Sequence, residues 1–205
     1  VDQFWEEQGV NKIRLSDFKR LPFMTRCIME TLRLHTAVPN GTFRKLSSKE
    51  TIHGKNGPAI LPKGTYVQIF NYPRHVSSEL WGPTAAEFDP TRDFQGNEIW
   101  DGEGHAFYNP SSKRFSPFTY GPRDCIGKNF AQLEMRLILL YLFRDFHFIL
   151  DEKQNKHIFS NLDSNVATMG PIDVYDPINA DNKGFRPFNN GMYTHVLKRS
   201  ARSTL

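Results

Sequence analysis

The feature that most constrains this chain is the segment FTYGPRDCIG, which leads directly into a long apolar stretch. Its fixed positions follow the spacing F-x-x-G-x-R-x-C-x-G and are Phe118, Gly121, Arg123, Cys125 and Gly127. The apolar stretch predicts a buried helix. A cysteine just before such a helix faces unpaired backbone N–H groups and the positive end of the helix dipole, which favour thiolate over thiol.

Each neighbour of the cysteine has a chemical reason to be there. Arg123 can hold a carboxylate, and Gly121 and Gly127 allow a tight backbone on which a flat cofactor can approach the sulfur. Phe118 can shield the sulfur from water, which tunes a metal–thiolate bond. The alternative, an inert structural thiol, is disfavoured by the four matched neighbours and by two further motifs upstream.

In these residues the chain resembles the cytochrome P450 family of haem-thiolate monooxygenases, whose enzymes hold haem through a thiolate. The resemblance implies that Cys125 is both the catalytic residue and the axial ligand of the iron in haem b (iron protoporphyrin IX). It also implies that Phe118, Gly121, Arg123 and Gly127 help to bind the haem. The loops and the C-terminal tail are most similar in style to those of eukaryotic microsomal members, fungal ones included.

A second motif, E-x-x-R, places Glu30 and Arg33 three residues apart on an apolar predicted helix. Such a spacing is also common in surface ion pairs, which contribute only about 0.2–0.5 kcal/mol. A buried pair needs further hydrogen bonds, which a third charged group such as Arg92 in FDPTRDF can supply. The resemblance implies a Glu30–Arg33–Arg92 network that locks the loop before Cys125 and serves folding and haem retention. Asp93 stands where the family usually has an aromatic residue.

Two other residues lie in sequence patterns that are less specific for a function. Arg44 begins a predicted strand and is either an exposed strand arginine or, by resemblance, a ligand of a haem propionate. His75, in NYPRHVS, lies near the position of a His-Arg pair that is usual in the family. We interpret His75 as a surface residue or as one that lies behind the site.

Basic residues flank the cysteine and are interpreted either as a solvated charged face or, by resemblance, as a docking surface for an acidic electron donor. They are Lys113, Arg114, Lys128 and Arg136.

The pattern along the chain predicts a mainly α protein with small β-sheets (α+β), which by resemblance is the C-terminal part of the cytochrome P450 fold, incomplete without its N-terminal half. The 205 residues are expected to form a single partial domain. Its expected parts are an ExxR helix at about 22–35, a β region at about 42–70, a meander and Cys loop at about 82–127, a long buried helix at about 127–146 and a C-terminal β region at about 156–198.

Composition narrows the classes of partner. The net charge is +4, but basic and acidic residues are interleaved, so nucleic-acid binding is not expected. The chain has only two cysteines, Cys27 and Cys125, and no CxxC motif, which disfavours zinc and a disulfide scaffold. No apolar run reaches the roughly 18 residues of a membrane span, and the chain does not begin with Met, so we expect an interior start.

For the parent protein, the resemblance implies O₂ activation at the haem iron and oxidation of a small apolar organic substrate. Electrons would come from NADPH through a diflavin reductase, or through cytochrome b5, at the cytoplasmic face of the endoplasmic reticulum membrane. Segments 35–42 and 166–171 are similar to turns that line the family's substrate pocket, and their small apolar residues suggest a hydrophobic substrate.

The family's acid–Thr pair, which manages protons on the distal side of the haem, has no match in this sequence. We therefore expect a fragment that is not catalytically competent in isolation. Two alternatives remain open: a haem-thiolate isomerase or dehydratase that needs no reductase, and a non-catalytic, truncated haem-binding chain.

Overall fold

We describe a computed structural model of the chain, covering residues 1–8, 13–95, 98, 112, 114–119, 123–150 and 194–199. The chain divides into two compact units. The first comprises Val1–Gly9 and Leu137–Leu205, and the second comprises Val10–Arg136. No helix among the described residues is long and apolar enough to cross a membrane.

The second unit is built around α2, Pro22–Leu34, which corresponds to the predicted ExxR helix. Pro22 occupies the first turn, where its missing N–H costs nothing and its fixed φ suits the helix. A short 3₁₀ helix, η1 (Leu15–Arg20), precedes α2. The sequence predicts burial around most of α2, but Phe23 is 62% exposed and Cys27 is half-buried. The helix is therefore amphipathic, and its buried face carries Met24, Thr25, Ile28, Met29, Glu30, Arg33 and Leu34.

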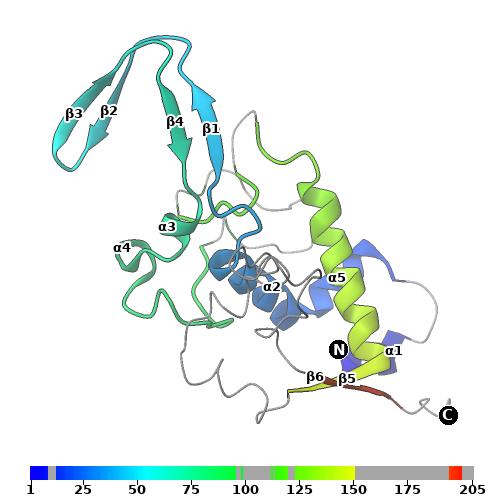
Figure 1. Ribbon diagram of the computed structural model, residues 1–205. Helices are drawn as coiled ribbons and strands as arrows, with labels where there is room; N and C mark the ends of the chain where they lie inside the picture. The colour runs from blue at the N-terminus through cyan, green and yellow to red at the C-terminus, as the bar shows by residue number, and fades with distance from the viewer. Residues whose placement is uncertain are drawn as a thin grey trace, which may run out of the picture. The chain divides into compact units, whose positions relative to one another are not determined.

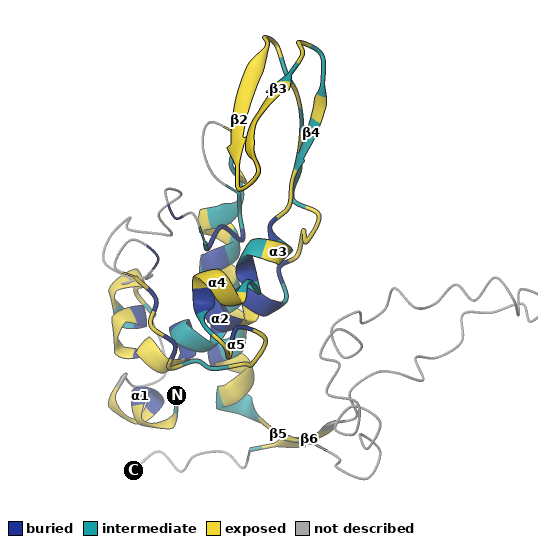
Figure 2. Ribbon diagram, turned by 90° about the vertical axis from the view of Figure 1, so that its left-hand side faces the viewer, coloured by how far each residue is buried: buried dark blue, intermediate teal, exposed yellow. Residues whose placement is uncertain are grey.

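Four strands after α2 form an extended arm (Figure 1). Strand β1 (Thr42–Lys45) pairs antiparallel with β4 (Tyr66–Ile69), and β2 (Glu50–Gly54) pairs antiparallel with β3 (Gly57–Leu61). Most residues of β2 and β3 are exposed (Figure 2).

The Gly57-Pro58 pair is typical of a turn, but both residues lie in strand β3. The turn is instead Lys55–Asn56, and Gly57 pairs with Gly54 at φ +100°. Pro58 is tolerated in β3 because both strands of a two-stranded sheet are edges, where a missing N–H leaves no partner unsatisfied.

Two short helices, α3 (Tyr72–His75) and α4 (Ser78–Trp81), return the chain to α2. Their buried rings meet those of the loop that follows. Trp81 lies edge-on to Phe94 and Phe115, with centroid distances of 5.5 and 6.3 Å, and His75 lies 5.6 Å from Phe115. This aromatic cluster is the part of the core nearest in sequence to the Cys125 loop.

Helix α5 (Lys128–Asp145) corresponds to the long helix predicted at 127–146 and spans both units. The prediction of a buried helix is wrong in part, because Phe130 is 69% exposed and Tyr141 is also exposed. The buried positions of α5 recur every fourth residue and include two polar side chains: Gln132, Arg136 and Leu140.

The first unit packs α1 (Asp2–Gln8) against the C-terminal half of α5. The indole N–H of Trp5 donates to the carbonyl of Leu140 at 3.3 Å, and the Arg144 guanidinium lies 5.1 Å from the Trp5 ring centre. Strands β5 (Phe146–Leu150) and β6 (Thr194–Lys198) form an antiparallel pair. The expected C-terminal β region is described only at β6, and the predicted pocket turn at 166–171 lies outside the described residues.

Candidate cofactor site

The loop that carries Cys125 is closed by backbone hydrogen bonds. The N–H of Thr119 donates to the Ser116 carbonyl at 3.0 Å, and the N–H of Cys125 donates back to the Phe118 carbonyl at 3.0 Å. The Cys125 carbonyl in turn accepts from the N–H of Lys128, the first residue of α5, at 3.2 Å. The cysteine is therefore fixed to both the loop before it and the helix after it.

The sulfur of Cys125 belongs to a free, exposed cysteine. A Cβ built on Gly127 would come within 3.9 Å of that sulfur, so glycine keeps this side of the cysteine open. The other cysteine, Cys27, is half-buried on α2, and burial raises the pKa of its thiol. Of the two cysteines, Cys125 is the more exposed.

The remaining predicted haem contacts differ in exposure. Phe118 is half-buried beside the loop turn and Arg123 is exposed, whereas Gly121 lies outside the described residues. Arg44 is partly exposed on β1, and its guanidinium donates to the carbonyl of Phe43 at 2.9 Å. A propionate-binding role for Arg44 stays a prediction.

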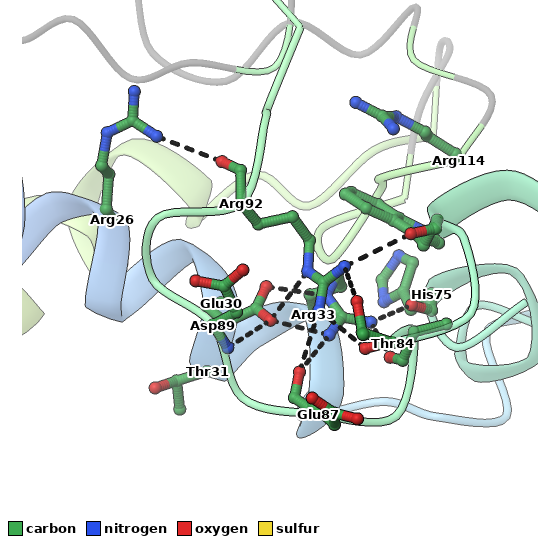
Figure 3. Close-up of polar contacts among 12 residues, drawn as sticks. Arg26, Glu30, Thr31, Arg33, His75, Thr84, Glu87, Asp89, Arg92 and Arg114 are labelled. Atoms are coloured by element: carbon green, nitrogen blue, oxygen red, sulfur yellow. Dashed lines mark hydrogen bonds and ion pairs between the residues drawn. The ribbon is translucent and has the colours of Figure 1, made fainter. Parts of the chain in front are cut away.

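The three residues of the predicted charged network lie in direct contact (Figure 3). Arg33 binds Glu30 through two parallel hydrogen bonds of 2.7 Å, and both side chains are fully buried. The Nε of Arg92 reaches the same carboxylate at 3.1 Å. Burial alone would raise the pKa of Glu30, but the hydrogen bonds and charge of Arg33, with those from Arg92 and the Asp89 N–H, lower it.

The remaining donors of the two arginines bind backbone carbonyls, which satisfies the charges that burial removes from water. Arg33 donates to the carbonyls of His75 and Ala85 at 2.6 Å each. Arg92 donates to the carbonyl of Thr84 at 2.8 Å. The network thus fastens segment 75–92 onto α2, and its role in locking the loop before Cys125 stays a prediction.

A second buried charged cluster lies closer to that loop and was not predicted from the sequence. The Glu98 carboxylate is fully buried and accepts two hydrogen bonds from Arg114, at 2.9 and 2.8 Å. The Ser112 hydroxyl donates to the same carboxylate at 2.6 Å. Its sequence signal is weak, because all three residues fall in a loop-rich stretch with no periodicity.

Trp81 joins the two charged clusters. The Arg114 guanidinium lies 4.2 Å from the centre of one ring of Trp81, and that of Arg33 lies 5.1 Å from it. Guanidinium groups over an indole are attracted by its π electrons, more strongly when desolvated.

Of the two interpretations of His75, the structure excludes a surface residue and agrees with one that lies behind the site. His75 is fully buried, and its Nε2 accepts the backbone N–H of Ser116 at 3.0 Å. Burial and the positive charge of Arg74 lower the pKa of His75 to about 3. The imidazole is therefore neutral at physiological pH.

Of the four basic residues around the cysteine, the three that the structure describes are buried or half-buried, and their role as a docking surface stays a prediction. Arg136 is only 2% exposed, Arg114 is engaged with Glu98, and Lys128 pairs with Asp124. Lys113 lies outside the described residues.

Comparison with known proteins identifies the class to which this fold and this loop belong. The sequence profile of cytochrome P450 matches residues 1–173. The chain therefore belongs to the cytochrome P450 family.

Curated relatives share about a third of the aligned residues. A probable cytochrome P450 508A4 of Dictyostelium discoideum is 34% identical over 67% of this chain and 26% of its own length. Cytokinin hydroxylase of Arabidopsis thaliana is 35% identical over 74% of this chain and 26% of its own. Benzoate 4-monooxygenase of Aspergillus niger is 33% identical over 66% of this chain and 24% of its own length. The chain spans about a quarter of the length of these relatives.

Solved structures agree on the fold. Retinoic acid-bound cyanobacterial CYP120A1 covers 97% of this chain with a TM-score of 0.59 and 26% identity, and 38% of that protein is matched. A zebrafish cytochrome P450 with abiraterone covers 73% of this chain and 32% of its own, with a TM-score of 0.57 and 23% identity. The chain has the fold of part of a cytochrome P450.

Proposed function

We propose that this chain is the part of a cytochrome P450 monooxygenase that holds the haem from its thiolate side, with Cys125 as the axial ligand. The observation that carries the proposal is the free, exposed sulfur of Cys125 within the F-x-x-G-x-R-x-C-x-G segment of a chain of this family. The neighbouring Gly127 leaves that sulfur open to a flat cofactor.

The residues around the sulfur fit a haem in kind. Arg123 is exposed two residues before the cysteine and supplies a cation for a propionate carboxylate. Phe118 is half-buried and supplies an apolar surface that limits water near the sulfur. When bound, haem supplies a redox-active iron for O₂ activation, which electron donation from a thiolate assists.

The activity of the whole protein is proposed to be oxygen insertion into a small apolar organic substrate. Relatives named for such oxidations, benzoate 4-monooxygenase and cytokinin hydroxylase, support the reaction class. We further propose that a NADPH-dependent reductase or cytochrome b5 supplies the electrons, and that the parent protein acts at the cytoplasmic face of the endoplasmic reticulum. Family membership supports both.

Haem titration of the purified chain tests the proposal. We expect one haem to bind per chain and the reduced carbon monoxide complex to have the red-shifted Soret band of thiolate ligation. Absence of saturable haem binding, or a carbonyl spectrum of nitrogen ligation only, would contradict it. The Cys27→Ser variant is the matched control, because it removes the other thiol and should leave the titration unchanged.

A further inference from the structure

His75 contacts both α2 and the segment that leads to Cys125. Its backbone carbonyl accepts from Arg33 at 2.6 Å, and its Nε2 accepts the Ser116 N–H at 3.0 Å. A nitrogen that accepts carries no proton, so the ring proton must reside on Nδ1. Nδ1 is buried and has no hydrogen-bond partner among the residues that the structure describes. The buried ring therefore has one nitrogen that is hydrogen-bonded and one that is not.

Ser116, the partner of His75, is fully buried and tied at each of its polar atoms. Its N–H donates to His75, its hydroxyl accepts from the Arg74 guanidinium, and its carbonyl accepts from the N–H of Thr119. Arg74 and His75 are adjacent on α3, and the Trp81 indole donates to the Arg74 carbonyl at 3.0 Å. Helix α3 thus holds Ser116 directly, and Trp81 of α4 in turn bonds α3.

The contacts continue from Ser116 to the cysteine. Thr119, bonded to the Ser116 carbonyl, has a φ of +61°, in the left-handed region. That conformation costs a non-glycine residue about 1–2 kcal/mol, so neighbouring contacts must hold it. Phe118, between these two residues, accepts the N–H of Cys125. Ser116 is therefore the anchor point from which the loop turns toward the sulfur.

We propose that His75 is a positioning residue that fixes the Cys125 loop by accepting the Ser116 N–H, and so links the loop to the charged network on α2. The proposal deepens the proposed function, on which it rests for the meaning of the loop. Substitution of His75 would then loosen residues 114–119 without unfolding α2, and haem would be held by a less ordered thiolate.

Hydrogen exchange of the chain without haem provides the test. The His75→Phe variant keeps a ring but has no acceptor. We expect amides of 114–119 to exchange about fivefold to tenfold faster in it, because one hydrogen bond is lost. His75→Gln places an amide oxygen near the Nε2 position and should restore slow exchange. Met29→Ala creates a cavity on the buried face of α2 and serves as the control for lowered global stability. It should leave exchange at 114–119 unchanged.

Unchanged exchange in His75→Phe, or equal acceleration in the Phe and Gln variants, would overturn the proposal. If His75→Phe fails to fold, ¹⁵N NMR of the wild-type imidazole decides. The proposal requires the Nδ1–H tautomer at neutral pH, and a Nε2–H tautomer or an imidazolium would overturn it. Both readouts use the haem-free chain, so failure to bind haem counts against the proposed function and leaves this test intact.

Carbon monoxide spectra of the haem-loaded variants give a second readout. We expect His75→Phe to convert from the thiolate form to the nitrogen- or thiol-ligated form several-fold faster than wild type, with His75→Gln close to wild type. Equal rates in all three proteins would show that His75 does not hold the loop.

Discussion

Arg33 and Glu30 form a bidentate ion pair with no solvent exposure, and each of its two N···O distances is 2.7 Å. A pair without water is stable only if its remaining donors and acceptors are bonded. The backbone carbonyls of the 75–87 segment and the guanidinium of Arg92 meet that requirement here. The pair therefore organises the segment that packs on α2.

Glu30→Ala removes the buried carboxylate that contacts both Arg33 and Arg92. We expect the free energy of unfolding to fall by about 3–5 kcal/mol, measured by urea denaturation. Lys55→Ala is the matched control, because the Lys55–Glu79 pair is exposed on both sides and should contribute about 0–1 kcal/mol. Similar losses in the two variants would contradict the structural role of Glu30.

The Glu98–Arg114 pair should be nearly as sensitive. Among the described residues, Arg114→Ala leaves the buried Glu98 carboxylate with the neutral donors of Gln95 and Ser112, and we expect a loss of about 2–3 kcal/mol in urea denaturation. Arg114→Lys should recover only part of it, because lysine lacks the planar fork that binds the carboxylate and stacks on Trp81.

Arg44→Ala is the control for Arg114, since this partly exposed guanidinium donates to a neighbouring carbonyl and should change stability by less than about 0.5 kcal/mol. An Arg114→Ala variant as stable as Arg44→Ala would refute the second cluster.

What the sequence predicts correctly is local or motif-based. Glu30 and Arg33 share one turn of a helix, and Pro22 marks the start of α2. Arg92 contacts Glu30 across 62 residues and was expected only through family resemblance. Local pattern could not place it.

What the sequence does not predict depends on long-range packing. His75 lies on a four-residue helix, too short for a buried face to appear as periodicity, and its partner is 41 residues away. Arg114 was grouped with other basic residues by sequence proximity, but a carboxylate 16 residues away determines its environment. Gly57-Pro58 has the composition of a turn, yet the hairpin turns two residues earlier, at Lys55–Asn56.

Acid should destabilise the chain through His75. Its pKa is 6.5 when unfolded and about 3 when folded, so the unfolded state binds more protons between these values. The charged groups that face the ring, Arg33 and Arg74, are both cations and oppose its protonation. The stability contributed by neutral His75 is complete above pH 6.5 and is lost as pH falls toward 3, by up to about 1.4 kcal/mol per pH unit.

Urea denaturation of wild type and His75→Gln between pH 7 and pH 4 measures this effect. The free energy of unfolding of the Gln variant should fall less steeply with acid. The difference in slope should correspond to close to one fewer proton taken up on unfolding. Parallel pH profiles of the two proteins would show that His75 is not buried in its neutral form.

Gly41 joins α2 to β1 with a φ of +66°, and a Cβ there would lie 1.8 Å from the carbonyl oxygen of Ile69. Gly41→Ala must therefore displace backbone, and we expect a loss above about 3 kcal/mol in thermal or urea unfolding. Gly64→Ala, with φ +89° and open space around the new Cβ, isolates the conformational strain and should cost about 1–2 kcal/mol. Equal losses would mean that the close approach to Ile69 is not made.

X-ray absorption at the iron edge of the haem-loaded chain is the most direct measurement of the central claim. If haem is bound through Cys125, a sulfur atom neighbours the iron in wild type and in Cys27→Ser, and this neighbour is absent in Cys125→Ser. A sulfur neighbour that persists in Cys125→Ser, or that is missing from the wild-type chain, would contradict the account.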